Sequence, residues 1–192
     1  MKLLFALFHA AVASQVVFDS LDPSPAGSFG TPVTREQSLG LQFRNVDVCG
    51  SVKLEYVNFT VSTENIENNS TWLQVALCPA ENGLPKCANN SNVAPQRFPV
   101  TAAAKRVQYS WVPSTDLTLR PATLYWFVLS SNAEQFNQAV IWLDGLKRFS
   151  TANDPKNDVL TAFTLSEAGD WASEPPKDNR AVSSMVVVAR DV

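Results

Sequence analysis

The chain has 192 residues, of which 45% are hydrophobic, 10% aromatic and 17% charged, with a formal net charge of −3. This length suits one compact domain, and the five tryptophans exclude the low-hydropathy composition of a disordered chain. The 18 acidic against 15 basic side chains argue against a nucleic-acid partner, because nucleic-acid-binding surfaces concentrate lysine and arginine.

The first thirteen residues have the pattern of a secretory signal peptide. Lys2 supplies a positive start, residues 3–11 are apolar, and Ala11-Val12-Ala13 fits a cleavage site. The apolar run is about half of the roughly 20 residues that span a bilayer. We therefore predict a signal peptide over residues 1–13 and a single domain over residues 14–192, secreted and without membrane insertion.

The position of the only histidine, His9, bears on catalysis. Cleavage after Ala13 would remove His9 and leave the mature domain without a histidine. Ser-His-Asp and Cys-His catalytic sets would then be impossible, and a catalytic zinc would lose its usual ligands. No glycine-rich phosphate-binding motif occurs either. We expect a protein that is not an enzyme, with no catalytic residue, metal or cofactor.

Four positions fit the N-x-S/T acceptor pattern for N-glycosylation. They are Asn58, Asn68, Asn69 and Asn89. Three of the four lie in polar stretches where a glycan would be solvated. We predict a glycoprotein with these four candidate sites.

Cys78 and Cys87 are predicted to form a disulfide, because export favours thiol pairing and the segment between them contains Asn82-Gly83 and two prolines. Closing this loop of about ten residues would contribute on the order of 2–3 kcal/mol. Cys49 is then left over, as a buried free thiol or as part of an intermolecular disulfide. Three cysteines also allow Cys49 to pair with either of the others.

Short stretches of alternating polar and apolar residues dominate the chain, separated by turn-forming residues. The alternation in 51–62 changes phase between Tyr56 and Val57, which predicts a β-bulge or a bend. The apolar run 124–129 predicts a central strand covered on both faces. Strands are expected over 15–20, 39–44, 51–62, 72–78, 106–112, 124–129, 139–143, 160–165 and 182–189.

This pattern predicts an all-β protein, an antiparallel β-sandwich or jelly roll of about nine to ten strands. One short helix is expected near residues 134–137.

Residues 117–130 read Leu-Thr-Leu-Arg-Pro-Ala-Thr-Leu-Tyr-Trp-Phe-Val-Leu-Ser. Together with the Gln42-Phe43 strand, the strand 73–78 with its Gly/Pro loop and the closing strand near Val186, this segment resembles the bacterial choice-of-anchor R domain. The resemblance covers about residues 38–189 and implies an exported β-sandwich module, without implying an activity. The chain departs from that family in its cysteines and in showing no anchor signal, which puts surface attachment in doubt.

Tryptophans are the candidate binding residues. Periodicity places Trp111 and Trp126 in the core, whereas Trp142 lies between Ile141 and Leu143 and is expected to face opposite to these two residues. Trp171 lies in the polar stretch 167–174 and is the first candidate for recognition, with Trp142 second. The alternative is that Trp171 folds back to cap one end of the sandwich.

The chain contains two kinds of oxygen-rich candidate site. Segment 153–158 gathers possible Ca²⁺ ligands, but Lys156 in its middle favours an ordinary turn. A glycoside hydrolase needs two carboxylates, and the candidates are Asp116, Glu134, Asp144 and Asp170. Solvated surface carboxylates are the better interpretation of these four.

The leading expectation is a secreted, non-enzymatic structural or adhesive component of an extracellular or cell-surface assembly. Its expected partners are other copies or other extracellular proteins, with glycans as further candidates. The alternative is a carbohydrate-binding, lectin-like module, and a glycoside hydrolase with a carboxylate pair stands third.

Overall fold

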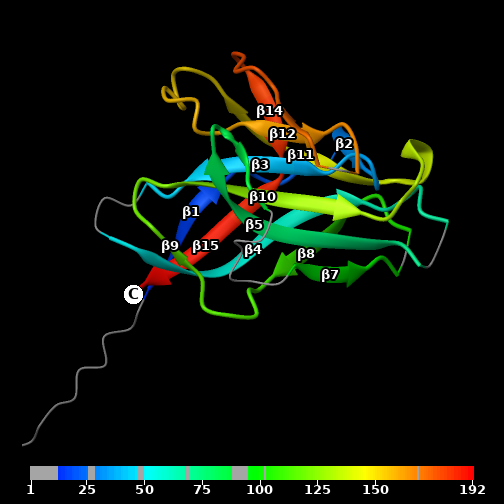
Figure 1. Cartoon of the computed structure of the whole chain (residues 1–192), viewed down its shortest axis with the longest axis horizontal. Coiled ribbons are helices and arrows are strands. Elements are labelled where there is room, and N and C mark those ends of the chain that lie inside the picture. The colour runs from blue at the N-terminus through cyan, green and yellow to red at the C-terminus, as the bar shows by residue number, and fades with distance from the viewer. Residues whose placement is uncertain are drawn as a thin grey trace, which may run out of the picture.

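The computed structural model of the protein describes residues 13–25, 29–46, 50–67, 70–87, 95–101, 103–167 and 169–192. Within these ranges, fifteen strands form two antiparallel sheets that pack as a β-sandwich, which confirms the predicted fold class (Figure 1). The strands outnumber the nine or ten expected because several have only two to four residues, too few to show an alternating pattern.

The first sheet contains eight strands within the described residues. They are β1 (Ser14–Asp19), β2 (Gly30–Val33), β4 (Val52–Ser62), β8 (Val107–Trp111), β9 (Thr118–Leu119), β11 (Val140–Phe149), β14 (Arg180–Ser183) and β15 (Met185–Asp191). The main path is β1-β15-β4-β11-β14; β2 pairs with β11, and β8 and β9 pair with β4. The sheet is therefore built around the long strands β4 and β11.

The second sheet contains seven strands within the described residues. They are β3 (Leu39–Arg44), β5 (Trp72–Glu81), β6 (Leu84–Pro85), β7 (Gln96–Pro99), β10 (Leu124–Ser131), β12 (Thr161–Thr164) and β13 (Trp171–Ser173). The order is β13-β12-β3-β10-β5-β6, with β7 paired to β5, so β10 lies between two neighbours and is the central strand that its apolar run predicted. A short 3₁₀ helix, η1 (Phe136–Gln138), lies close to the expected helix.

The phase change in β4 corresponds to a β-bulge. Val188 of β15 pairs with Tyr56, but the next residue, Ala189, pairs with Leu54, so Glu55 has no opposite partner. The extra residue lets Leu54 and Val57 both reach the core although their separation is odd. The bulge predicted from the sequence is confirmed.

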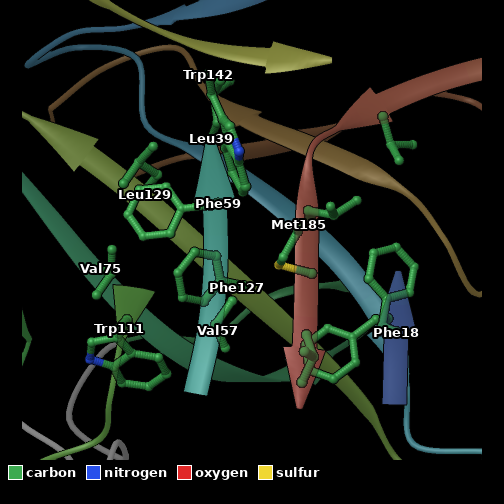
Figure 2. Packing of buried hydrophobic residues seen from close by; sticks show 14 of the residues in the cluster. Phe18, Leu39, Val57, Phe59, Val75, Trp111, Phe127, Leu129, Trp142 and Met185 are labelled. Carbon is green, nitrogen blue, oxygen red and sulfur yellow. The ribbon is translucent and has the colours of Figure 1, made fainter. Parts of the chain in front are cut away.

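The core between the sheets is rich in aromatic rings. Figure 2 shows Phe59 and Phe127 facing each other across it, with ring centroids 5.5 Å apart. Trp111 lies 5.7 Å and Trp142 6.0 Å from Phe127, at tilted and edge-on angles. Burying each such ring contributes on the order of 1.5–3 kcal/mol. The aromatic core makes the sandwich a rigid support for its outer faces.

Trp142 faces opposite to Ile141 and Leu143, as expected, but it faces the core and is not exposed for recognition. Its side chain is fully buried beside Phe59, and its Nε1 donates a hydrogen bond to the Ser184 carbonyl oxygen at 3.0 Å. The flanking Ile141 and Leu143 point outward and line a surface hollow with Pro25, so both parities of this strand are apolar. The alternating pattern therefore does not indicate which parity of the strand faces the core. A buried Trp142 cannot serve as a recognition surface.

The predicted disulfide between Cys78 and Cys87 is confirmed. The bond closes a tight hairpin in which β5 pairs with β6. Asn82 and Gly83 occupy the turn with φ of 52° and 76°, the left-handed conformation that a two-residue hairpin turn requires. The disulfide therefore ties the end of β5 to the segment that returns over the second sheet.

Candidate functional site

The outer face of the second sheet, which points away from the core, carries the candidate site. On β5, Leu73 and Val75 point into the core, so Trp72 and Gln74 point outward. Trp72 begins β5, beside the end of β10, because Leu73 pairs with Ser131. Trp72 is half-buried and therefore partly open to solvent.

A second, smaller buried cluster covers the middle of this outer face. Its fully or nearly fully buried members are Cys78, Trp126, Val128 and Ala162, and Trp171 packs against them. The outward parity of β10 is thus apolar because the disulfide hairpin and β13 cover it. This explains why both parities of the 124–129 run are hydrophobic.

Trp171 is half-buried at the start of β13, where it pairs with Thr164 of β12. A ring carbon of Trp171 lies 3.5 Å from where a Cβ on Gly40 would stand, and a ring carbon of Trp126 lies 3.1 Å from the same point. The missing side chain at Gly40 lets Trp171 approach the sheet closely. This geometry matches the alternative in which Trp171 folds back, but onto the outer face rather than onto an end of the sandwich.

A cleft of about 520 Å³ opens at the Trp72 end of the same face. We call it the Trp72 cleft. Its lining includes Trp72, Arg97, Ser130, Asn132, Glu134 and Arg35. These side chains come from four separate segments of the chain, so no local sequence motif indicates the cleft.

Arg97 of β7 lies over the ring of Trp72. Its guanidinium carbon is 4.2 Å from the ring centroid, within the range of a cation–π interaction. Its Nε donates a hydrogen bond to Oε1 of Gln74 at 3.0 Å. Arg97 makes no ion pair with any carboxylate of the described residues. An exposed cation is therefore held in position by an aromatic ring and an amide.

Fixed hydroxyl and amide groups form another wall of the Trp72 cleft. The Ser38 hydroxyl donates to the Ser130 hydroxyl oxygen at 3.0 Å. Oδ1 of Asn132 accepts the backbone N–H of Trp72 at 2.8 Å, and its Nδ2 donates to the Ser70 carbonyl oxygen at 3.1 Å. These bonds orient the polar lining before any ligand arrives.

The charged groups of the Trp72 cleft balance in number. Arg35 and Arg97 are positive, whereas Glu134 and Glu167 are negative. Arg35 pairs with Glu167 at 3.0 Å, and this hydrogen bond raises the pKa of Arg35. Arg97 and Glu134 are left as the charges without a salt bridge among the described residues. The cleft thus presents one cation and one anion to a ligand.

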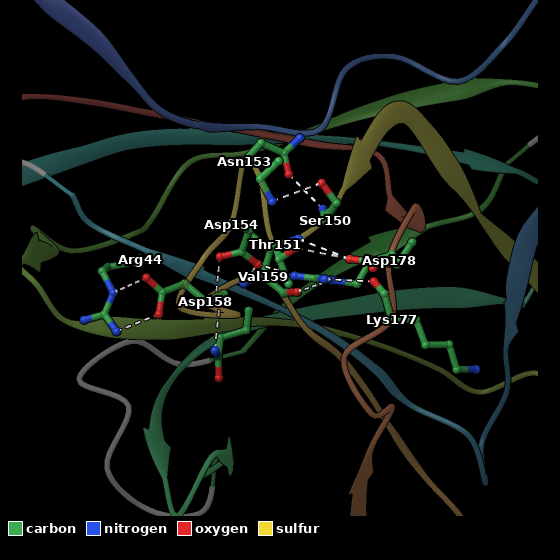
Figure 3. Close-up of polar contacts among 12 residues, drawn as sticks. Arg44, Ser150, Thr151, Asn153, Asp154, Asp158, Val159, Lys177 and Asp178 are labelled. Atoms are coloured by element: carbon green, nitrogen blue, oxygen red, sulfur yellow. Dashed lines mark hydrogen bonds and ion pairs between the residues drawn. The ribbon is translucent and has the colours of Figure 1, made fainter.

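A second polar cluster, the Asp154/Asp158 cluster, joins Arg44 at the end of β3 and Arg180 of β14 through the loop 153–158 (Figure 3). Arg44 donates to both oxygens of Asp158 at 2.5 and 2.7 Å. Asp154 accepts the backbone N–H groups of Asp158 and Val159 and pairs with Arg180. The carboxylates of the loop 153–158 are already occupied, which supports a turn rather than a calcium site. No group of three or more metal-ligating side chains occurs among the described residues.

The four candidate carboxylates of a hydrolase lie in different surroundings. Of the four, Glu134 alone lines the Trp72 cleft. Asp116 pairs with Lys53 at 2.7 Å, Asp170 is exposed, and Asp144 lies in β11, where burial raises its pKa. The second carboxylate of the cleft, Glu167, is neutralised by Arg35 and was not among the candidates.

Several predicted sites fall outside the described residues, namely residues 1–12 of the signal peptide, Cys49, Asn68, Asn69 and Asn89. Asn58 is described. It lies in the middle of β4, opposite Ser110 of β8 and Val186 of β15, and its Oδ1 is buried. Glycosylation at Asn58 stays a prediction, on a side chain that is only half accessible.

No protein-family model matches the chain, and no curated protein matches it either. The resemblance to the choice-of-anchor R domain therefore stays an expectation. Among the described residues, no helix has the length and hydropathy needed for a membrane crossing.

Proposed function

We propose that the protein is a secreted, non-enzymatic β-sandwich that acts as a structural or adhesive component of an extracellular or cell-surface assembly. The Trp72 cleft is its contact surface. The observation that carries this proposal is the arrangement of Arg97, which is stacked on Trp72 at the mouth of a cleft and is not paired with a carboxylate of the described chain.

Such an arrangement favours recognition. Aromatic and arginine side chains dominate the energetics of binding surfaces, because they bury large areas with few rotatable bonds or with fixed donor geometry. The supporting sheet is held by the aromatic core on its inner side and by the Cys78–Cys87 hairpin on its outer side. A rigid support reduces the entropy lost when a partner binds.

The confirmed disulfide is consistent with an oxidising, extracellular environment. The predicted signal peptide points the same way, and β1 starts at Ser14, directly after the predicted cleavage site. Both features support the secreted part of the proposal.

The test is a binding assay on the intact secreted protein with surface material from the cells that produce it. Non-reducing gels and light scattering would report self-assembly in the same preparation. We expect retention on that surface, reduced at least fivefold by Arg97→Gln and unchanged by Arg120→Gln, an exposed arginine outside the Trp72 cleft. A strictly monomeric protein that binds nothing on the native surface would contradict the proposal.

A further inference from the structure

We infer that the Trp72 cleft binds a saccharide that carries a carboxylate, such as a uronic acid unit of an extracellular polysaccharide. This inference rests on the proposed function, because it names the ligand class of the same site. The carbohydrate contact then lies at Trp72 and Arg97. The sequence suggested Trp171 and Trp142 instead.

Arg97 is the group that would bind the carboxylate. A guanidinium group has a planar edge with two parallel N–H donors, which matches a carboxylate in a two-bond arrangement. In Arg97 the Nε is used by Gln74 and the plane is held over Trp72. No described hydrogen bond uses the two terminal nitrogens of Arg97. The side chain therefore offers its terminal nitrogens in a fixed orientation to an incoming carboxylate.

Hydroxyl-binding groups also line the cleft. Glu134 is exposed and accepts hydrogen bonds when ionised, so a ligand hydroxyl can replace a water molecule that donates to it. The Ser38–Ser130 hydroxyl pair can both donate and accept. Sugar rings carry several hydroxyls that do the same. A simple carboxylic acid would use Arg97 but none of these groups.

The charges of the cleft limit what can attract a ligand. The two arginines and two glutamates balance, so a carboxylate would be held by local bonds to Arg97 and not by a broad positive field. A ligand with one carboxylate for each sugar unit and otherwise neutral hydroxyls fits one unpaired cation and one unpaired anion.

The volume of the Trp72 cleft and the position of Trp72 suit a sugar ring. The cleft volume of about 520 Å³ lies within the roughly 300–1,000 Å³ of typical small-molecule sites. Trp72 is half-buried and lines the cleft. The apolar C–H face of a sugar can pack there while its carboxylate reaches Arg97.

The experiment measures binding of the secreted protein to immobilised polygalacturonate, alginate and hyaluronan, each beside its own carboxyl-reduced form. The paired polymers differ in charge but keep their linkages and hydroxyls. We expect at least one acidic polymer to bind at least tenfold more tightly than its reduced partner. Arg97→Gln should remove this preference for the acidic polymer. Arg97→Lys should retain only part of it, and Arg120→Gln should leave it intact.

Several results would overturn the inference. These are equal binding of the acidic and reduced polymers, no binding to any polymer of the panel, or an equal loss in Arg120→Gln. Equally tight binding of poly-aspartate would assign the cleft to acidic peptides. If adhesion to native surface material persists and still falls in Arg97→Gln but not in Arg120→Gln, the ligand class is wrong and the proposed function stands. If adhesion also fails, both are wrong.

Discussion

Arg97 differs from the arginines of the Asp154/Asp158 cluster in its partners. In that cluster, Arg44 pairs with Asp158 and Arg180 with Asp154. In the Trp72 cleft, Arg35 is also paired, with Glu167, whereas Arg97 lies over Trp72 and has no carboxylate partner among the described residues. The paired arginines contribute to the fold. Arg97 keeps a positive charge that a ligand can bind.

Burial supports the same division. The side chains of Arg180 and Asp154 are only 10% and 6% exposed, so their charges depend on each other. Arg97 is exposed and needs no partner for its solvation. A substitution in the Asp154/Asp158 cluster should therefore lower the free energy of unfolding. A substitution at the Trp72 cleft should instead weaken the binding of a ligand.

Arg180→Ala should produce the largest effect, a loss of about 3 kcal/mol in the free energy of unfolding, because the buried Asp154 carboxylate loses its cation and keeps only two backbone N–H donors. Arg180 also donates through Nε to the Val159 carbonyl oxygen at 3.0 Å, which adds to the loss. Urea unfolding of the secreted protein measures it. In the double variant Asp154→Ala/Arg180→Ala the loss should be less than the sum of the two single losses. Additive losses would show that the pair is not coupled.

Replacing both Cys78 and Cys87 by alanine should have the next largest effect, about 2–3 kcal/mol from the loss of a closed loop. The hairpin covers the cluster that contains Trp126 and Trp171. We therefore also expect a red shift of tryptophan emission in the folded variant. An unchanged midpoint of unfolding would mean that apolar packing alone holds the hairpin.

Asp144→Asn should have a smaller, pH-dependent effect. Burial raises the pKa of Asp144, Glu174 raises it further, and the nearby Arg148 lowers it without reversing the direction. A raised pKa in the folded state means that the carboxyl favours folding when protonated and loses this contribution as the pH rises through that pKa.

The Asn variant should therefore melt at a higher temperature than the wild type near pH 7. The difference should vanish at roughly pH 3, below the ordinary aspartate value of about 3.9. Thermal unfolding at the two pH values measures it. A variant less stable than wild type at neutral pH would show that Arg148 outweighs burial.

The fold was largely predictable because strand periodicity, the bulge in β4 and the Asn-Gly hairpin are local signals. The inward orientation of Trp142 was not, since Ile141 and Leu143 on the other parity are also apolar and line a hollow with residues distant in sequence. The Trp72 cleft was missed for a related reason. Leu73 and Val75 on the inward parity already implied an outward Trp72, but Arg97 and Glu134 reach it only through the fold. Pairing between remote strands leaves no pattern in the sequence.

The most direct test of the contrast compares Arg97→Gln with Arg44→Gln, because both remove one arginine charge from the same outer face. The account predicts that Arg97→Gln changes the free energy of unfolding by no more than about 0.5 kcal/mol and loses at least tenfold in affinity for the acidic polysaccharide. Arg44→Gln should lose stability by breaking its bonds to Asp158 and keep its affinity once folded. Equal affinity of the two folded variants, or a comparable loss of stability in both, would contradict the account.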